Sequence, residues 1–428
     1  MRHTKFRAPF YGWVIVASVF TAGVFAGGIG FWGIGVFALP MEDELGWSRT
    51  TIFAALSIRA LVGGAVAPFI GPVLDSRRGP RRLALAGSVL LGLSLIGMRY
   101  VDNVWEFYLL YGFLGALAML TTGQNMAQVL VPKWFIRRRG RALAFATMGT
   151  PLSGIIFTVP LQWVVATVGW REAWFMLGVL AFVMLVPAAL LLRTRPEDVG
   201  LLPDGDTQAR PSVAQSARQA NLAVGQSLTR GEALRSRRFW LILLAIGTVG
   251  MGVQGFQPNW LPYFQDIGFS ARTGAIAIAI YGLFAASARL IWGTLAERFP
   301  SRNLMVAQTA LTAAVIIYLF TVRNPVMLFS YAVLQGLTMG GQFILQPLMV
   351  ANYFGHEHLG AVRGMMRPFI TFSGAIGPVF VAGLFDTTGS YQTAFIAVTG
   401  TWVLASLIYL LAVPPIKASR AEQAVSPQ

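Results

Sequence analysis

Long apolar runs recur along the whole chain, and each is close to the length that a helix needs to cross a lipid bilayer. One crossing takes about 20 residues, and 55% of the 428 residues are hydrophobic while only 12% are charged. A soluble globular chain carries about a quarter charged residues. Transmembrane β-strands would give short alternating segments instead. The pattern therefore predicts an all-α protein that crosses a membrane many times.

Twelve spans are predicted, and their boundaries place both termini on one side of the membrane. The first run follows a basic start but is too long for the apolar core of a signal peptide, so we interpret it as a span. The predicted spans are 12–39, 50–74, 83–98, 104–131, 142–164, 172–192, 239–264, 272–296, 303–321, 326–352, 365–385 and 391–413.

The basic residues follow this topology. A net charge of +16 could indicate a nucleic-acid partner, but most of the 33 Lys and Arg lie in segments on the side of the termini. The positive-inside rule then makes the termini cytoplasmic. We expect a multi-pass protein of the cytoplasmic (inner) membrane that contacts the lipid bilayer, binds no nucleic acid and functions as a monomer.

Several features recur 222 residues apart, which indicates an internal repeat. Leu39 and Pro40 match Leu261 and Pro262, and ELGWS from Glu44 matches DIGFS from Asp266. We expect two six-helix halves that cross in the same direction, with the substrate bound between them near the midplane and exposed to each side in turn. The predicted domains are an N-terminal half at 1–193, a cytoplasmic linker at 194–237, a C-terminal half at 238–415 and a tail at 416–428.

Basic and acidic residues cluster with glycine at the cytoplasmic ends of the second and eighth spans. GPVLDSRRGPRR begins at Gly71 and GTLAERFPSRN begins at Gly293. Both resemble the signature of the major facilitator superfamily, which implies a twelve-helix fold of two parallel repeats and charge pairs that break as the halves move. The expected gating residues are Gly71, Asp75, Arg78, Gly79, Arg81, Arg82, Arg139, Gly140, Arg141, Gly293, Glu297, Arg298, Arg302, Arg363 and Gly364.

Shorter motifs resemble the branch of that superfamily that contains monocarboxylate transporters and oxalate/formate antiporters. These motifs are Tyr11-Gly12-Trp13, KWFIRRRGRALA from Lys133, GWREAW from Gly169, RPEDVGLLPDG from Arg195, and Ala288-Arg289. The resemblance implies a carrier of small carboxylates in which the arginine of the eighth span holds the substrate carboxylate.

Three arginines remain inside the predicted spans: Arg59, Arg289 and Arg367. A charge at such depth is costly and usually marks a pathway or a pair. Arg289 lies eight residues from Glu297, or about 12 Å along a helix, which is near the middle of the bilayer. Because its repeat counterpart is Ala67, the shared scaffold does not require this cation. A guanidinium binds both oxygens of a carboxylate, so we expect Arg289 to be the main substrate ligand.

Polar side chains in other spans complete the candidate site. Glutamines spaced four apart share one helical face, where they either contact substrate or join neighbouring helices. Glycines and a proline in the seventh span favour a broken helix that exposes backbone to the cavity. With Arg59, Arg289 and Arg367, the candidate substrate-binding residues are Gln124, Gln128, Gln254, Gln257, Asn259, Tyr281, Gln342 and Gln346.

The coupling ion stays open at this stage. The animal-type carriers have an aspartate four residues before the eighth-span arginine, and that position is Ala285 here. All 17 acidic residues fall in loops or at span ends, so either proton symport or exchange with a counter-anion is compatible with the chain. The antiporters use a second cation in the eleventh span, where only Arg367 is available, and one deep cation favours monocarboxylates.

Other functional classes find little support. The chain has no cysteine, and its only lysines, Lys5, Lys133 and Lys417, do not follow a glycine as a phosphate-binding loop requires. We therefore expect no enzyme activity, no cofactor and no metal, including at His356 and His358. The alternative is an efflux carrier for amphipathic compounds, which the many aromatic and methionine residues favour.

Overall fold

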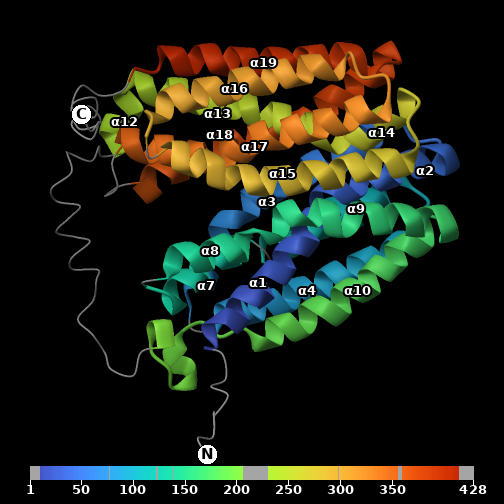
Figure 1. The fold of residues 1–428 in the computed structure, drawn as a ribbon. Helices are drawn as coiled ribbons and strands as arrows, with labels where there is room; N and C mark the ends of the chain where they lie inside the picture. Colours follow the sequence, from blue (N-terminus) through green and yellow to red (C-terminus); the bar gives the residue numbers. More distant parts are fainter. Residues whose placement is uncertain are drawn as a thin grey trace, which may run out of the picture.

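The computed structural model describes residues 10–76, 78–121, 124–136, 138–205, 230–296, 298–354 and 359–413. These residues form a helical bundle in which the long helices run roughly side by side (Figure 1). Eleven helical segments in this part of the chain are long and apolar enough to cross a membrane, and the shorter apolar segment Val104–Leu120 lies in the fourth predicted span. The all-α membrane fold predicted from the sequence is confirmed.

The first half contains six spans, three of which are interrupted. The helices are α1 (Gly12–Gly27), η1 (Gly28–Gly33), α2 (Ile34–Leu45), α3 (Arg49–Asp75), α4 (Gly79–Gly97), η2 (Met98–Tyr100), α5 (Val104–Phe107), η3 (Tyr108–Leu114), α6 (Gly115–Leu120), α7 (Gln124–Trp134), α8 (Arg139–Thr147), α9 (Gly149–Val168) and α10 (Trp170–Leu191). Both η1 and η3 are π-helices, a form that often occurs at functional sites.

The second half repeats this arrangement after a linker that includes the 3-10 helices η4 (Pro196–Val199) and η5 (Pro203–Gly205) and the helix α12 (Arg230–Arg235). The helices are α13 (Arg237–Phe256), η6 (Gln257–Asn259), α14 (Trp260–Asp266), α15 (Ala271–Ala296), α16 (Ser301–Leu319), α17 (Pro325–Phe354), α18 (Leu359–Thr388) and α19 (Tyr391–Leu411). The 3-10 turn η6 lies in the seventh span, where the sequence favoured a break, but the span remains helical from Arg237 to Asp266.

Turn residues define where the spans begin and end. Ser48 caps α3, because its hydroxyl accepts a hydrogen bond from the backbone N–H of Thr51. Gly46 ends α2 in the left-handed conformation, with φ of 66°, which glycine adopts without steric cost. The chain therefore reverses within three residues, and the start of α3 stays beside the end of α2.

The two halves meet through two helix pairs: α3 packs along α18, and α9 packs along α15. The close approach of α9 and α15 depends on Gly282, where a Cβ would lie 3.0 Å from the carbonyl oxygen of Pro151. We call the end of the bundle that holds the linker the linker end, and the end that holds the α2–α3 and α14–α15 turns the far end. In Figure 1 the linker end lies on the left and the far end on the right.

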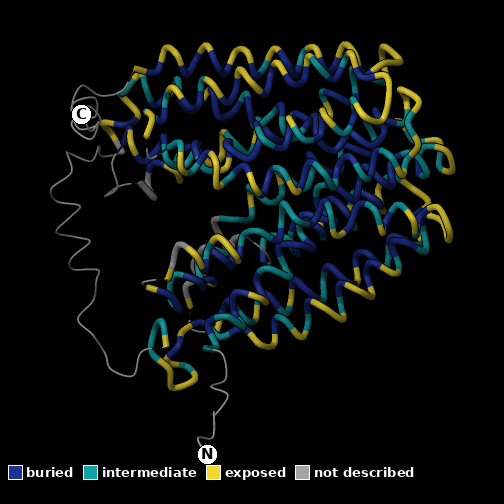
Figure 2. The backbone as a smooth tube through the Cα atoms, viewed as in Figure 1, coloured by how far each residue is buried: buried dark blue, intermediate teal, exposed yellow. Residues whose placement is uncertain are grey.

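Exposed residues lie mainly on the outside of the bundle (Figure 2), and many of them are large and apolar. Trp105, Val326 and Leu290 are 80%, 73% and 71% exposed. Apolar exposure of this extent fits a surface that faces lipid rather than water.

Tryptophans near span ends often anchor a helix at the membrane interface, but two such tryptophans are buried here. Trp134 is fully buried and its indole N–H donates to the carbonyl of Arg193, while the indole N–H of Trp170 donates to Glu44. Each finds a protein partner near a span end, so neither side chain anchors its helix in the lipid interface. Trp240 is exposed, and Trp47 is partly buried.

Candidate substrate cavity and gates

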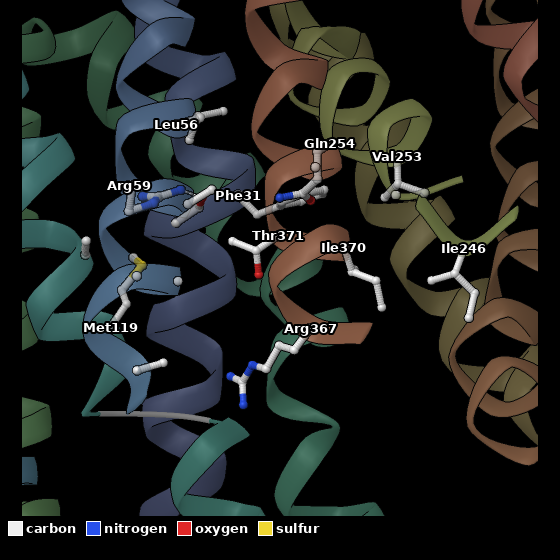
Figure 3. Close-up of a pocket in the computed structure, with 18 of the residues that line it drawn as sticks. Phe31, Leu56, Arg59, Met119, Ile246, Val253, Gln254, Arg367, Ile370 and Thr371 are labelled. Atoms are coloured by element: carbon white, nitrogen blue, oxygen red, sulfur yellow. Dashed lines mark hydrogen bonds between the residues drawn. The ribbon is translucent and has the colours of Figure 1, made fainter. Parts of the chain in front are cut away.

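A cavity of about 470 Å³ lies between the two halves. On α3 it is lined by Leu56, Arg59, Gly63 and Ala67, whose spacing of three and four residues places them on one helical face. Residues of α13, α17 and α18 line the other side. Figure 3 shows Arg59 and Gln254 on opposite sides of this space, with Phe31 between them.

We call this first space the central lobe. A second lobe of about 530 Å³ continues the cavity between α9 and α15. The two lobes share lining residues from both halves, so together they form one space. These shared residues are Gly30, Phe31, Met119, Val253, Gln254 and Phe343. On α15 the second lobe is lined by Tyr281, Ala285 and Arg289, which are spaced four apart and share one face.

Arg289 faces the second lobe with few protein partners. Its guanidinium carbon lies 5.1 Å from the centroid of the Phe343 ring, and its buried Nε has no hydrogen-bond partner. Small neighbours allow α15 to pack closely on α17, since a Cβ at Gly340 would lie 2.6 Å from the Cβ of Ala288. Packing therefore holds the Arg289 side chain, while its Nε donor is left without an acceptor.

Arg59 reaches the same space from the first half. One terminal nitrogen, Nη2, donates to the carbonyl of Gly30 in the π-helix η1, and the guanidinium lies over the Tyr111 ring at 4.8 Å. The other terminal nitrogen, Nη1, is buried and has no hydrogen-bond partner. No pattern in the sequence indicated the π-helix that brings the carbonyl of Gly30 to this arginine.

Arg367 lies in a different setting. It is exposed, lines the central lobe, and points away from Gln254 in Figure 3. A third cavity of about 540 Å³ adjoins the central lobe at Gly64, Ala67 and Arg367 and extends to Gly364. Because Ala67 and Gly364 are close to the linker-end termini of α3 and α18, the cavities extend towards the linker end.

The predicted amides separate into three groups. Gln254 lines both lobes, Gln342 and Gln346 line the central lobe, and Gln257 lines the second lobe and donates to the Tyr281 hydroxyl at 2.6 Å. Asn259 is fully buried outside the lining; its amide donates to the carbonyl of Gly255, and its oxygen accepts from the Tyr391 hydroxyl. The side chains of Gln124 and Gln128 lie outside the described part of the chain.

Aromatic rings from both halves close the cavity on the side of the far end. Trp32 of the first half packs against Trp260 and Tyr281 of the second half, with ring centroids 5.9 Å and 5.6 Å away. The backbones of the two halves also approach closely here, since a Cβ at Gly35 would lie 2.6 Å from the carbonyl oxygen of Pro258. Little space is left for a solute to pass at this level.

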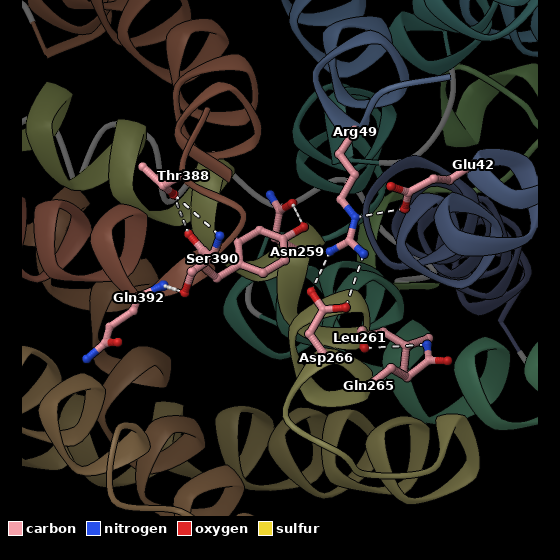
Figure 4. A network of polar contacts seen from close by, with 10 residues as sticks. Glu42, Arg49, Asn259, Leu261, Gln265, Asp266, Thr388, Ser390 and Gln392 are labelled. Atoms are coloured by element: carbon pink, nitrogen blue, oxygen red, sulfur yellow. Dashed lines mark hydrogen bonds and ion pairs between the residues drawn. The ribbon is translucent and has the colours of Figure 1, made fainter. Parts of the chain in front are cut away.

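Beyond this aromatic layer, a charge network joins the halves at the far end (Figure 4). The guanidinium of Arg49 binds both carboxylate oxygens of Asp266, at 2.6 Å and 3.1 Å, and Glu42 at 2.8 Å. It also lies 4.0 Å from the centroid of the Phe385 ring. Only 5% of the Arg49 side chain is exposed. We call Glu42, Arg49 and Asp266 the far-end latch.

The sequence prediction did not include the latch. Its available signal was a basic residue, Arg49, next to the acidic run Glu42–Glu44 in a turn on the side that holds few basic residues. Another contact between the halves supports it, because the backbone N–H of Thr50 donates to Asp386 at 2.9 Å. Among the described residues, the hydrogen bonds that cross between the halves lie at this end.

The predicted gating motifs lie at the linker end. Arg78, Arg82, Arg141, Arg298 and Arg363 are exposed there. Arg81 has a buried Nε without a hydrogen-bond partner, and Arg302 donates to the carbonyl of Leu410 at 2.8 Å. Gly79 begins α4, Gly293 lies in α15 and Gly364 in α18. The side chains of Asp75 and Arg139, the surroundings of Gly71 and Gly140, and residues Glu297, His356 and His358 lie outside the described part.

Spans arranged as two parallel six-helix repeats around a cavity that both halves line define the class of membrane transporters with two rocking halves. The chain belongs to the Major Facilitator Superfamily, whose model matches residues 20–267 and 242–427. The resemblance inferred from the sequence is thereby confirmed, and members of this family are transporters rather than enzymes.

Characterised relatives lie in the branch that the short motifs indicated. The oxalate:formate antiporter of Oxalobacter formigenes is 24% identical over 386 residues, which cover 89% of this chain and 86% of the antiporter. Monocarboxylate transporter 11 of Mus musculus is 27% identical over 420 residues, which cover 94% of this chain and 87% of that protein.

The fold is also similar to that of a solved structure. A bacterial homolog of the human lysosomal transporter Spinster, in an inward-facing and unoccupied conformation, superposes with a TM-score of 0.69 at 14% identity and covers 98% of this chain. The match covers 99% of that structure.

Proposed function

We propose that this protein is a secondary active transporter of a small organic carboxylate and that Arg289 binds the carboxylate. A monocarboxylate is the simplest substrate that satisfies this one arginine. The observation that carries the proposal is an arginine with a partnerless Nε in a cavity between the two halves. A guanidinium in such a site gains most from a planar anion, because two parallel N–H groups can bind its two oxygens.

The lining supports an anion rather than a cation. The described residues that line the two lobes include Arg59, Arg289 and Arg367 and no Asp or Glu. Gln254, Gln342 and Gln346 add amide N–H donors around the space. A cationic solute would meet like charge without a counter-charge, whereas a carboxylate would neutralise part of it.

Alternating access follows from the contacts between the halves. We infer that the latch and the aromatic layer close the far end in this conformation, and that the cavity opens towards the linker end. The linker end would be cytoplasmic, because the basic residues concentrate there, and the membrane would be the cytoplasmic (inner) membrane. The opposite state would then require the latch to break.

Coupling is proposed to run by anion exchange or by proton symport. The absence of carboxylates from the described lining favours exchange, because a counter-anion can use the same arginine without a titrating group in the cavity. Two similar proteins carry the names oxalate:formate antiporter and monocarboxylate transporter. Neither name decides the coupling of this chain.

Purified protein in liposomes tests the proposal. We expect uptake of labelled lactate, pyruvate, formate or oxalate, and a stimulation by unlabelled anion inside the vesicles if the protein exchanges anions. Stimulation by an inward proton gradient instead would indicate symport. Failure to transport any of these carboxylates would contradict the proposed function.

An efflux carrier for amphipathic compounds is the second candidate. The observation that favours it is the apolar part of the lining, because the lobe that Arg59 and Arg367 line also includes Phe31, Ile246, Val253 and Ile370. The same liposomes distinguish the two, because extrusion of a cationic dye without carboxylate transport would support the efflux carrier.

A further inference from the structure

Arg59 is a second cation of the cavity, and it comes from the half opposite Arg289. The central lobe includes Arg59 and the second lobe includes Arg289, and the lobes are joined through Gly30, Phe31 and Phe343. Gly30 accepts the hydrogen bond of Arg59, and the Phe343 ring lies against Arg289. Each guanidinium therefore borders a residue that lines both lobes.

The contacts of Arg59 fix its position but leave one of its terminal nitrogens unused. The Gly30 carbonyl holds Nη2, and the Tyr111 ring covers the guanidinium face. The Tyr111 hydroxyl donates to the carbonyl of Ile29, in the same π-helix. Nη1 remains buried without a partner. An arginine that only joined helices would be expected to use both terminal nitrogens, since a buried donor without an acceptor is destabilising.

The scaffold shared by the two halves does not explain the residue. The repeat counterpart of Arg59, 222 residues on, is Tyr281, and that of Arg289 is Ala67. Each half therefore contributes one partly buried cation at a position where the other half has none. Without a carboxylate in the described lining of either lobe, these two charges have no counter-charge there, and unpaired charge at this depth usually marks a functional site.

We propose that Arg59 binds a second carboxylate of the substrate, so that a dicarboxylate is held between Arg59 in the first half and Arg289 in the second. The inference rests on the proposed function, because it requires the first carboxylate to bind Arg289. Gly30 and Phe31 line the space beside Arg59 and carry no side-chain oxygen or nitrogen that would compete for it. A dicarboxylate neutralises both guanidiniums, whereas a monocarboxylate leaves one of them unpaired.

A bridging substrate also links binding to conformational change. Arg59 lies on α3 and Arg289 on α15, helices that belong to different halves. An anion that contacts both draws the halves together around the cavity, and a ligand shifts a conformational equilibrium only by such differential contacts. Dicarboxylates are therefore the better substrates for exchange, and monocarboxylates the weaker ones.

Competition in liposomes tests this assignment. Each unlabelled acid is added as a competitor for the uptake of a labelled carboxylate. The acids are compared in pairs of equal carbon number, which are oxalate with acetate, malonate with propionate, and succinate with butyrate. For at least one pair, we expect the dicarboxylate to inhibit the wild-type protein at a concentration about tenfold lower than its monocarboxylate partner. In Arg59→Gln we expect that preference to fall by about tenfold, whereas Arg272→Gln, an exposed arginine on α15, should keep it.

Three results would overturn the inference. These are a wild-type protein with no dicarboxylate preference, an Arg59→Gln variant that weakens both members of a pair equally, and an Arg272→Gln variant that loses the preference as well. A wild-type protein that transports no carboxylate at all would instead contradict the proposed function itself. If Arg59→Gln fails to fold, the thermal stability of the wild-type protein decides, since the dicarboxylate must stabilise it more than its partner at equal concentration.

Discussion

Arginine occurs in two opposite settings in this molecule. At the far end, Arg49 is buried and binds Asp266 and Glu42, so its charge is compensated within the protein. In the cavity, Arg59 and Arg289 each keep a buried nitrogen without a partner. The same side chain thus closes a gate where carboxylates are supplied by the chain and forms a candidate anion site where they are not. Compensated charge holds the halves together, and uncompensated charge is available to a ligand.

The largest effect is expected from reversing the charge of the latch. Arg49→Glu removes two sets of charge-assisted hydrogen bonds, each contributing roughly 1.5–3 kcal/mol, and adds repulsion with Asp266 and Glu42. We expect the far end to open. Because the chain has no cysteine, an engineered cysteine at Leu261, which is 1% exposed, reports the opening through labelling by an impermeant maleimide.

Labelling at Leu261→Cys should be slow in the parent protein and at least about tenfold faster with Arg49→Glu. A cysteine at the exposed Ser270 on the same side is the control and should react equally in both. Asp266→Asn should have a smaller effect, because Arg49 keeps Glu42. Unchanged labelling at Leu261→Cys would show that the latch does not hold the far end closed.

A smaller effect is expected where the halves meet through backbone. In Gly35→Ala the new Cβ would lie 2.6 Å from the carbonyl oxygen of Pro258, and overpacking costs about 1–3 kcal/mol. We expect faster labelling of Leu261→Cys than in the parent. Gly400→Ala is the matched control, because a Cβ there meets no atom within 4 Å. If both variants label alike, close packing at Gly35 does not contribute to the closed state.

The smallest effect concerns the apolar support of Arg289. Phe343→Leu keeps an apolar side chain but removes the ring beneath the guanidinium, and such a cation–π contact is worth about 0.5–1 kcal/mol at a partly exposed site. We expect the half-saturating carboxylate concentration to rise about two- to fivefold. The concentration dependence of uptake measures it, with Phe113→Leu, an exposed position in η3, as the control. A change of a hundredfold would mean that the ring contacts the substrate directly.

The fold could be predicted because it follows from patterns that the bilayer imposes. Apolar length predicted the spans, and the repeat predicted the two six-helix halves. That Tyr281, Ala285 and Arg289 share one face of α15 could also be predicted from the sequence, because residues four apart lie on the same side of a helix. These features depend on local sequence and on one dominant solvent, the lipid.

The gates and the setting of Arg59 could not be predicted because they depend on contacts distant in sequence. Arg49 and Asp266 are 217 residues apart, and the repeat, which matches Asp266 with Glu44, does not indicate that Asp266 pairs with Arg49. The carbonyl of Gly30 reaches Arg59 within a π-helix, for which the apolar sequence GIGFWG gives no sign. Asn259 illustrates the same limit, since a polar residue at a predicted break turned out to hold Tyr391 rather than line the cavity.

The central claim is that Arg289 binds the carboxylate of the substrate. Uptake of labelled carboxylates by liposomes that contain Arg289→Gln tests it most directly, with Arg272→Gln as the matched control on the same helix. We expect uptake to fall by at least about a hundredfold in Arg289→Gln, because the buried ion pair with the substrate is lost, and to remain in Arg272→Gln. Normal uptake by correctly inserted Arg289→Gln protein would contradict the claim.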